Sequence, residues 1–129
     1  MGHHLADQSV YYGDEAGMQG YKDPFNRGCY PWGKENQELI TFYRTMGEIR
    51  TEHKVFEKGY FSPVSYMLGC VAFRRYDENG DVMVIVNRNE HSINYRLPDF
   101  YQNAKTLYGD NIQNGEVYID GCSFVILSL

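Results

Sequence analysis

The sequence has no surplus of positive charge and no long hydrophobic run. Its 129 residues carry 12 Lys and Arg against 17 Asp and Glu, a formal net charge of −5. Binding to a nucleic-acid backbone relies on clustered Lys and Arg, so we expect no nucleic-acid partner. A membrane-spanning helix needs about 20 apolar residues in succession, and a secretory signal needs an apolar run of about 7–15 residues after a basic start. The apolar runs here are only a few residues long, so we expect no membrane segment and no secretion signal.

Closely spaced cysteines and histidines are also scarce. Cys29, Cys70 and Cys122 form no C-x-x-C pair, whereas a metal site needs closely spaced Cys or His ligands. The one close histidine pair, His3 and His4, stands beside the first Met, so we expect no metal and no cofactor. An odd number of cysteines leaves at least one thiol free. We therefore predict buried, reduced thiols in a cytoplasmic protein.

Aromatic residues, in contrast, are abundant. Twelve Tyr, seven Phe and one Trp make up 16% of the chain. A pleated strand accommodates aromatic side chains well, and exposed aromatic rings also suit the surfaces of sugars. Core packing accounts for most aromatic residues in most proteins. The composition therefore favours a β-rich fold and leaves carbohydrate binding open.

The chain before residue 54 consists of a loop and a helix. Residues 1–33 are rich in Gly, Tyr, Pro and Asp and contain a short strand-like stretch at 9–12. The repeated Gly and Pro residues indicate a loop. A loop of about 20 residues is uncommon unless it forms a binding site. Residues 34–53 predict one amphipathic helix. Its apolar residues recur at spacings of three and four: Leu39, Phe42, Tyr43, Met46 and Ile49.

From Val55 onward the hydrophobic period changes to two, which predicts strands. Turn signals such as the Asn-Gly pairs at 79–80 and 114–115 separate these strands. The predicted strands are 60–66, 68–76, 81–88, 92–97, 105–108, 116–119 and 123–127. We therefore predict a mainly β protein, in which an antiparallel β-sandwich at 55–129 follows the loop and helix of 1–54.

The residues by themselves show no catalytic set. Glycoside hydrolysis needs two carboxylates that flank one bond, about 5–5.5 Å apart in retaining enzymes. Asp14 and Glu15 are adjacent, and in a strand they would point to opposite sides. Asp23 has no evident carboxylate partner in its loop. Neither a Ser-His-Asp or Cys-His pattern nor a phosphate-binding glycine motif is recognisable.

The order of motifs in the first 50 residues is more specific. Residues 11–18 read YYGDEAGM, followed by DPFNR at 23–27 and YPW at 30–32; within the helix, FYR at 42–44 is followed by IR at 49–50. This order resembles the α-amylase family of glycoside hydrolases, and most closely its neopullulanase, cyclomaltodextrinase and maltogenic amylase branch. There YYGDE-G ends the last strand of the (β/α)8 catalytic barrel. A DPxNR loop, YPW, the eighth helix and a β-sandwich called domain C follow, so the resemblance covers residues 9–129.

The resemblance implies a substrate-binding loop without the catalytic residues. The family's catalytic carboxylates follow barrel strands four, five and seven, and none of those segments is in this sequence. Asp23 and Arg27 match loop positions that hydrogen-bond glucose hydroxyls in this branch, and a carboxylate and a guanidinium suit such hydroxyls. The alternative role for these two residues is an ion pair that shapes the loop. Tyr30 and Trp32 are candidates for stacking on a sugar ring, with structural packing before the helix as the alternative.

The resemblance weakens at two places. Residues 1–8 differ from the family's approach to the eighth strand, and Gly28 stands where a second Arg is common. The match therefore breaks near the point where the rest of a barrel would join. This break favours a truncated piece of a longer enzyme.

We therefore expect the C-terminal fragment of a neopullulanase-like α-glucan hydrolase. The parent would hydrolyse α-1,4 or α-1,6 links in an α-glucan oligosaccharide, and the fragment alone would be an inactive structural or accessory unit. One alternative is an interaction subunit that completes a barrel in trans. The other is an autonomous carbohydrate-binding module, which needs an exposed aromatic platform. The candidates for that platform are Tyr66, Tyr76, Tyr95, Tyr101 and Tyr108.

Self-association is a further expectation. In the family, the eighth helix packs against other barrel elements, and the strand that corresponds to 9–12 lies between two neighbours. This sequence contains neither set of partners. The helix face or the 9–12 strand would therefore need a new partner, and we expect a dimer or larger oligomer. The residues of that face are Leu39, Phe42, Tyr43, Met46 and Ile49.

Overall fold

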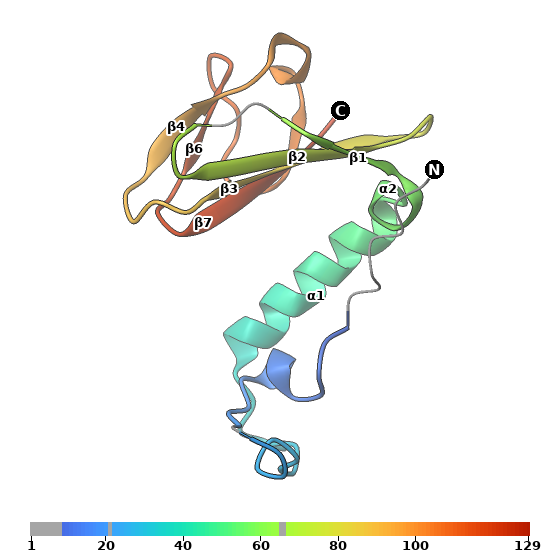
Figure 1. The fold of residues 1–129 in the computed structure, drawn as a ribbon, viewed down its shortest axis with the longest axis vertical. Helices are drawn as coiled ribbons and strands as arrows, with labels where there is room; N and C mark the ends of the chain where they lie inside the picture. Colours follow the sequence, from blue (N-terminus) through green and yellow to red (C-terminus); the bar gives the residue numbers. More distant parts are fainter. Residues whose placement is uncertain (1–8, 21, 65–66) are drawn as a thin grey trace. The chain divides into compact units, whose positions relative to one another are not determined.

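The computed structural model describes residues 9–20, 22–64 and 67–129 (Figure 1). It divides the chain into two compact units, residues 1–51 and 52–129. The first unit contains a 3-10 helix, η1 (Asp14–Ala16), a long loop and nearly all of helix α1 (Gln37–Glu52). The second begins with a one-turn helix, α2 (Val55–Lys58), and continues as strands. That residues 1–54 are the end of a catalytic barrel and 55–129 a separate domain stays a prediction.

Two antiparallel sheets make up most of the second unit. The larger sheet has the strand order β1-β2-β3-β7-β5, and the smaller pairs β4 with β6. This arrangement confirms the predicted mainly β fold with antiparallel sheets after one long helix. The strands are β1 (Tyr60–Pro63), β2 (Cys70–Tyr76), β3 (Asp81–Asn87), β4 (Ile93–Arg96), β5 (Lys105–Tyr108), β6 (Glu116–Ile119) and β7 (Ser123–Ser128), with a 3-10 helix η2 (Asp99–Tyr101) between β4 and β5.

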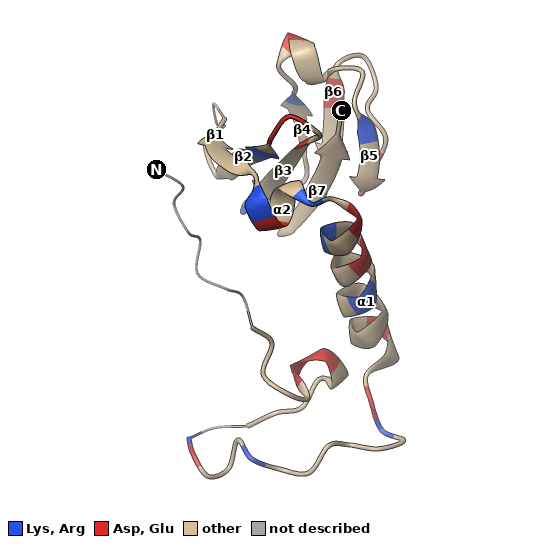
Figure 2. Cartoon of the chain, turned by 90° about the vertical axis from the view of Figure 1, so that its right-hand side faces the viewer, with Lys and Arg blue, Asp and Glu red and all other residues tan. Residues whose placement is uncertain are grey.

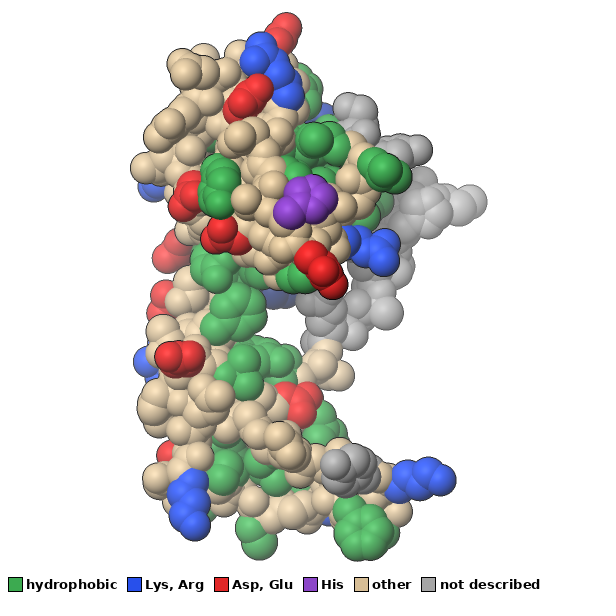
Figure 3. Space-filling model, turned by 90° about the vertical axis from the view of Figure 1, so that its left-hand side faces the viewer, with side chains coloured by type: hydrophobic (Ala, Val, Ile, Leu, Met, Phe, Trp, Pro, Cys, Tyr) green, Lys and Arg blue, Asp and Glu red, His purple; other side chains and the backbone are tan. Residues whose placement is uncertain are grey.

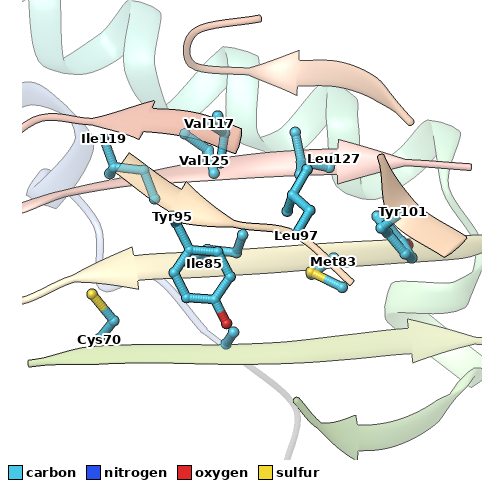
Figure 4. Packing of buried hydrophobic residues seen from close by; sticks show 11 residues of the cluster. Cys70, Met83, Ile85, Tyr95, Leu97, Tyr101, Val117, Ile119, Val125 and Leu127 are labelled. Atoms are coloured by element: carbon cyan, nitrogen blue, oxygen red, sulfur yellow. The ribbon is translucent and has the colours of Figure 1, made fainter. Parts of the chain in front are cut away.

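The hydrophobic core lies between the two sheets (Figure 4). Burial alternates along the strands: in β6, Val117 and Ile119 are buried, whereas Tyr118 is exposed. The same alternation buries Tyr95 of β4 between two exposed neighbours. A period of two therefore decides which face of each strand points inward. The buried cluster consists of Cys70, Ala72, Met83, Ile85, Tyr95, Leu97, Tyr101, Val117, Ile119, Val125 and Leu127.

A buried amide links the two sheets at the end of β3. The Asn87 side chain is fully buried, and its Nδ2 donates to the backbone carbonyls of His91 (2.9 Å), Ile119 (3.3 Å) and Asp120 (3.0 Å). Its Oδ1 accepts from the backbone N–H of Asn89 at 3.0 Å. A buried polar side chain needs such partners to offset its desolvation. Because Ile119 ends β6, the amide ties the larger sheet to the smaller one.

The predicted strands agree closely with the observed ones. The predictions 105–108 and 116–119 coincide with β5 and β6, and 123–127 extends by one residue to Ser128 in β7. The first two predicted strands are shorter in the structure, as β1 and β2. Helix α2 was not predicted, because its one turn is too short to show a helical period. It ends at Gly59, whose N–H donates to the carbonyl of Val55 at 2.9 Å.

Helix α1 begins after Asn36, three residues later than predicted. The Asn36 Oδ1 accepts from the N–H of Leu39 at 3.0 Å, which is the arrangement of a helix N-cap. Charged residues of both signs are distributed along the helix (Figure 2). On the predicted apolar face, Ile49 is buried, and the other members are half-buried: Leu39, Phe42, Tyr43 and Met46.

The predicted strand at 9–12 is wrong. These residues form no strand, and within the described residues the first strand begins at Tyr60. A strand requires a neighbour that pairs with its backbone, and the described part of the first unit offers none. The backbone instead enters a turn, in which the N–H of Asp14 donates to the carbonyl of Tyr11 at 3.1 Å.

Candidate functional site

The motif at residues 11–18 folds as a tight turn around η1. Gly13 and Gly17 flank η1 with φ of 86° and 77°, a left-handed region that glycine enters without steric cost. The N–H of Met18 donates to the carbonyl of Gly13 at 3.0 Å, and that of Gly17 donates to the carbonyl of Asp14 at 3.1 Å. The glycines of this motif therefore serve a backbone turn.

Two hydrogen bonds connect this turn to the rest of the loop and to α1. The N–H of Asn36 donates to the carbonyl of Ala16 at 2.9 Å, and the Tyr12 hydroxyl donates to the carbonyl of Gly28 at 3.0 Å. Desolvation first, and then the neighbouring Tyr11, raise the pKa of Tyr12 above its usual value of 10. This shift favours the protonated hydroxyl that donates to Gly28.

Asp23 and Arg27 form an ion pair within the loop. The distance from Arg27 Nε to Asp23 Oδ1 is 2.6 Å, and the two side chains are 68% and 60% exposed, respectively. Backbone hydrogen bonds from Phe25 to Lys22 (2.8 Å) and from Arg27 to Pro24 (3.0 Å) curl the segment into a turn. The structure thus contains the ion pair, and its role in shaping the loop stays a prediction. It also leaves both charged groups open to solvent, and their role in sugar binding stays a prediction.

A shallow pocket of about 170 Å³ lies beside the turn. Its volume is below the range of about 300–1,000 Å³ that is usual for ligand pockets. Neither Asp23 nor Arg27 lines it, so the structure does not bring the predicted sugar-binding pair into this pocket. The buried Oδ1 of Asn26 makes no hydrogen bond within the described residues. The pocket is lined by Tyr11, Tyr12, Asp14, Met18, Gln19, Gly20 and Asn26.

Tyr30 and Trp32 lie together, as their spacing in the YPW motif allows. Their ring centroids are 4.7 Å apart with an interplanar angle of 53°. Trp32 is 82% exposed, whereas Tyr30 is half-buried. Desolvation, followed by the carboxylates of Glu15 and Glu35, raises the pKa of Tyr30. The exposed indole is open to a stacking partner, and sugar stacking stays a prediction for both residues.

The predicted aromatic platform on the sandwich is wrong for two of its members. Tyr95 and Tyr101 are buried in the core, with 3% and 0% exposure. Tyr76 and Tyr108 are half-buried, and Tyr66 lies outside the described residues. Strand alternation explains Tyr95, because its two polar neighbours point outward. The ring of Tyr101 packs in the core cluster, where its hydroxyl donates to the Asp81 carboxylate at 2.7 Å.

The cysteines also differ from the prediction. Cys70 is buried, and burial raises the pKa of its thiol, but Cys29 and Cys122 are exposed. The prediction of buried thiols is therefore wrong for two of the three, since both lie in loops outside the core. Across residues 9–20, 22–64 and 67–129, no group of three or more His, Cys, Asp or Glu is placed to hold a metal ion. No helix in these ranges is both long and apolar enough to cross a membrane.

Curated relatives match the chain over a small part of their own length. An amylopullulanase of Thermoanaerobacter thermohydrosulfuricus is 43% identical over 72 residues, which are 56% of this chain and 5% of the relative. A maltogenic α-amylase of Bacillus acidopullulyticus is 30% identical over 118 residues, or 83% of this chain and 20% of the relative. A cyclomaltodextrinase of Thermoanaerobacter pseudethanolicus is 36% identical over 83 residues, which are 62% of this chain and 14% of the relative. No protein-family model matches the chain.

Solved structures show the same fold. A debranching enzyme of Nostoc punctiforme, in a crystal soaked with acarbose, aligns with a TM-score of 0.78 and 24% identity. The alignment covers 93% of this chain and 25% of that chain. A maltogenic amylase of S. marinus aligns with a TM-score of 0.72 and 24% identity, over 92% of this chain and 16% of that chain.

The fold and the relatives identify the chain as a member of the α-amylase family of glycoside hydrolases, and its match to a small part of each relative is consistent with a C-terminal fragment. Within that family, the chain is homologous to the branch of neopullulanase-type enzymes that includes maltogenic amylase and cyclomaltodextrinase.

Proposed function

We propose that this chain is the C-terminal part of a neopullulanase-type α-glucan hydrolase and acts there as a structural and accessory unit. The order of its folded parts carries the proposal. A glycine-flanked turn, the DPFNR loop, a long helix and antiparallel sheets follow one another as in the family. The names of the relatives support an α-glucan substrate for the parent, because they refer to pullulan and to maltodextrins.

The accessory role rests on what the 129 residues contribute. The family's catalytic carboxylates belong to barrel segments that this sequence does not contain. Of the acidic residues in the loop, Asp23 is engaged by Arg27. In this proposal, the groups that the chain offers a glucan are the exposed Asp23–Arg27 ion pair and the exposed ring of Trp32.

The chain alone should not hydrolyse α-glucans. Incubation with maltoheptaose, pullulan or β-cyclodextrin is expected to release no reducing sugar above the blank, because the two carboxylates that such hydrolysis requires are not assembled. Activity that scales with protein and persists through a second purification would contradict the proposal. A separate experiment tests the alternative that the chain completes a barrel in trans: mixing the chain with a separately produced barrel would then restore hydrolysis. The DNA upstream of the coding region should encode that barrel.

We also propose that the isolated chain associates with a second copy of itself. Large hydrophobic side chains reach the surface on the face shown in Figure 3. Counted over all sides of the first unit, the exposed large hydrophobic residues of its described part are Val10 (57%), Tyr11 (48%), Tyr12 (45%), Phe25 (76%) and Trp32 (82%). Soluble monomers rarely leave such surface open, and residues 9–12 form no strand with the rest of the chain.

Light scattering over a range of concentrations tests this association. We expect a mass above the 15.0 kDa of one chain. Tyr11→Glu should shift the mass toward the monomer, because it places a charge within this exposed hydrophobic surface. Thr41→Glu adds the same charge at an exposed position of α1, outside that set of residues, and should leave the mass unchanged. A monodisperse 15.0 kDa species at high concentration would refute self-association.

A further inference from the structure

A second, larger pocket lies on the sandwich. Its volume is about 430 Å³, within the range of ligand pockets. It is formed by the outward-facing side of the β4–β6 pair and by the loop between β5 and β6. Figure 2 labels these three strands, β4, β5 and β6. Its lining is polar apart from one aromatic ring: Asn94, Asp110, Asn111, Gln113, Asn114, Glu116 and Tyr118.

Strand register places the aromatic ring and one amide side by side. Asn94 of β4 pairs directly with Tyr118 of β6. Residues directly opposite each other on antiparallel strands share a face, with Cβ atoms about 5 Å apart. The flanking Val117 and Ile119 are buried, so Asn94 and Tyr118 face outward. Tyr118 is 42% exposed, and its ring is therefore available to a ligand.

The loop that completes the pocket is held by its backbone. The N–H groups and carbonyls of Gln113 and Glu116 bond to each other at 2.8 and 3.0 Å. The Thr106 hydroxyl donates to the carbonyl of Asp110 at 3.0 Å. The Gly115 carbonyl accepts from the N–H of Leu97 at 2.9 Å. Because these bonds use the backbone atoms of the loop, the loop side chains remain available to hydrogen-bond a ligand.

The side chains of this pocket match a neutral polyhydroxyl ligand. The four amide side chains make no hydrogen bond with any described residue, and each offers both a donor and an acceptor. The Asp110 carboxylate adds acceptors, while Glu116 lies 3.9 Å from Arg96 at the rim. A sugar hydroxyl both donates and accepts, and the C–H face of a sugar ring packs on an aromatic ring. The lining contains carboxylates and neither Lys nor Arg, which disfavours phosphate-bearing ligands. The amides belong to Asn94, Asn111, Gln113 and Asn114.

We propose that this pocket binds a segment of a neutral α-glucan chain, with Tyr118 as the stacking platform and the surrounding amides as hydroxyl partners. The polyhydroxyl class follows from the lining. The α-glucan identity rests on the proposed function of the parent enzyme. The site would hold the polymer on the sandwich and contribute no bond-breaking step.

Titration of the ¹⁵N-labelled 129-residue chain with maltoheptaose, followed by NMR, tests the proposal. Amide shifts are expected at Asn94 and across 110–118. Tyr118→Ala should weaken binding about tenfold, because an aromatic contact is lost. Tyr60→Ala removes another exposed tyrosine of the sandwich, 67% exposed on β1, and should leave the affinity unchanged. Gln113→Ala provides a second test that leaves the aromatic ring in place, and circular dichroism verifies the fold of each variant.

The outcomes separate this site from the proposed function. Shifts at the pocket that Tyr118→Ala weakens and Tyr60→Ala does not would support the site. Shifts confined to residues 11–32, or no binding at millimolar maltoheptaose, would overturn the proposed pocket site. The proposed function would be tested separately, by assaying the proposed parent enzyme for α-glucan hydrolysis. Equal or tighter binding of cellohexaose would overturn the α-glucan assignment and would also count against the proposed parent. Binding that survives both Tyr118→Ala and Gln113→Ala would show that the ligand sits elsewhere.

Discussion

Replacing Asp81 by alanine is expected to lower the free energy of unfolding of the sandwich by about 3 kcal/mol. Asp81 Oδ1 accepts from Arg74 Nε at 3.1 Å and from the Tyr101 hydroxyl at 2.7 Å, and Arg74 also contacts Oδ2. The side chains of Arg74 and Asp81 are only 22% and 18% exposed. Alanine would leave the guanidinium and the buried hydroxyl without their acceptor.

The electrostatics of this cluster agree with that expectation. The hydrogen bond from Arg74 to Asp81 raises the pKa of Arg74. Burial, followed by the separate hydrogen bond from the Tyr101 hydroxyl to Asp81, raises the pKa of Tyr101 well above 10. Arg74 also lies over the rings of Tyr76 and Phe100, at 4.8 and 4.9 Å from their centroids. The carboxylate therefore positions a cation that two aromatic rings share.

Urea unfolding followed by circular dichroism would measure the effect. Glu78→Ala is the matched control, because it removes an exposed carboxylate from the turn that precedes Asp81, and it should change stability by no more than about 0.5 kcal/mol. Equal stabilities for Asp81→Ala and Glu78→Ala would show that the cluster contributes nothing to folding.

Asp23→Ala or Arg27→Ala should lower kcat/KM of the proposed parent enzyme by about ten- to a hundredfold on longer substrates. A hydrogen bond to a charged group is worth roughly 1.5–3 kcal/mol, which corresponds to that range. An exposed ion pair is worth at most about 1 kcal/mol, and the pair here is more than half exposed. The loop-shaping role alone therefore predicts a change of no more than about fivefold. Steady-state kinetics on maltooligosaccharides of increasing length separate the two roles.

Exchanging the two charges sharpens that comparison. The double variant Asp23→Arg, Arg27→Asp keeps an ion pair but exchanges the positions of donor and acceptor. If the residues bind sugar hydroxyls, the double variant stays as impaired as the single ones. Recovery of kcat/KM in the double variant would mean that the ion pair only shapes the loop.

Strand alternation predicts more about the aromatic residues than their number does. Tyr95 stands between Asn94 and Arg96, so the pattern already indicates an inward ring, and the structure buries it. Tyr118 stands between Val117 and Ile119, so the same pattern indicates an outward ring. The platform prediction relied on residue type and therefore included Tyr95 and omitted Tyr118.

Other features depend on contacts between distant residues and were not predictable from local patterns. Tyr101 packs in the core and donates to Asp81, twenty residues earlier in the chain. The strand-like residues 9–12 have the right composition, but pairing requires a neighbour that the described part of their unit does not contain. The polar pocket likewise arises only when the loop between β5 and β6 lies against the β4–β6 pair. The order of motifs, in contrast, identified the family because it requires no knowledge of these contacts.

The position of β7 sets the order in which the sandwich can be completed during synthesis. β7 (Ser123–Ser128) lies between β3 and β5 in the larger sheet, and its register pairs Val82 with Ser128. The C-terminal strand of this sheet therefore occupies an interior position, and the edges of β3 and β5 that face it stay unpaired until β7 has emerged from the ribosome. Pairing between segments so far apart in sequence is slow, and unpaired edges are open to aggregation. The sandwich therefore closes after translation of residue 128, whereas α1 can form while synthesis continues.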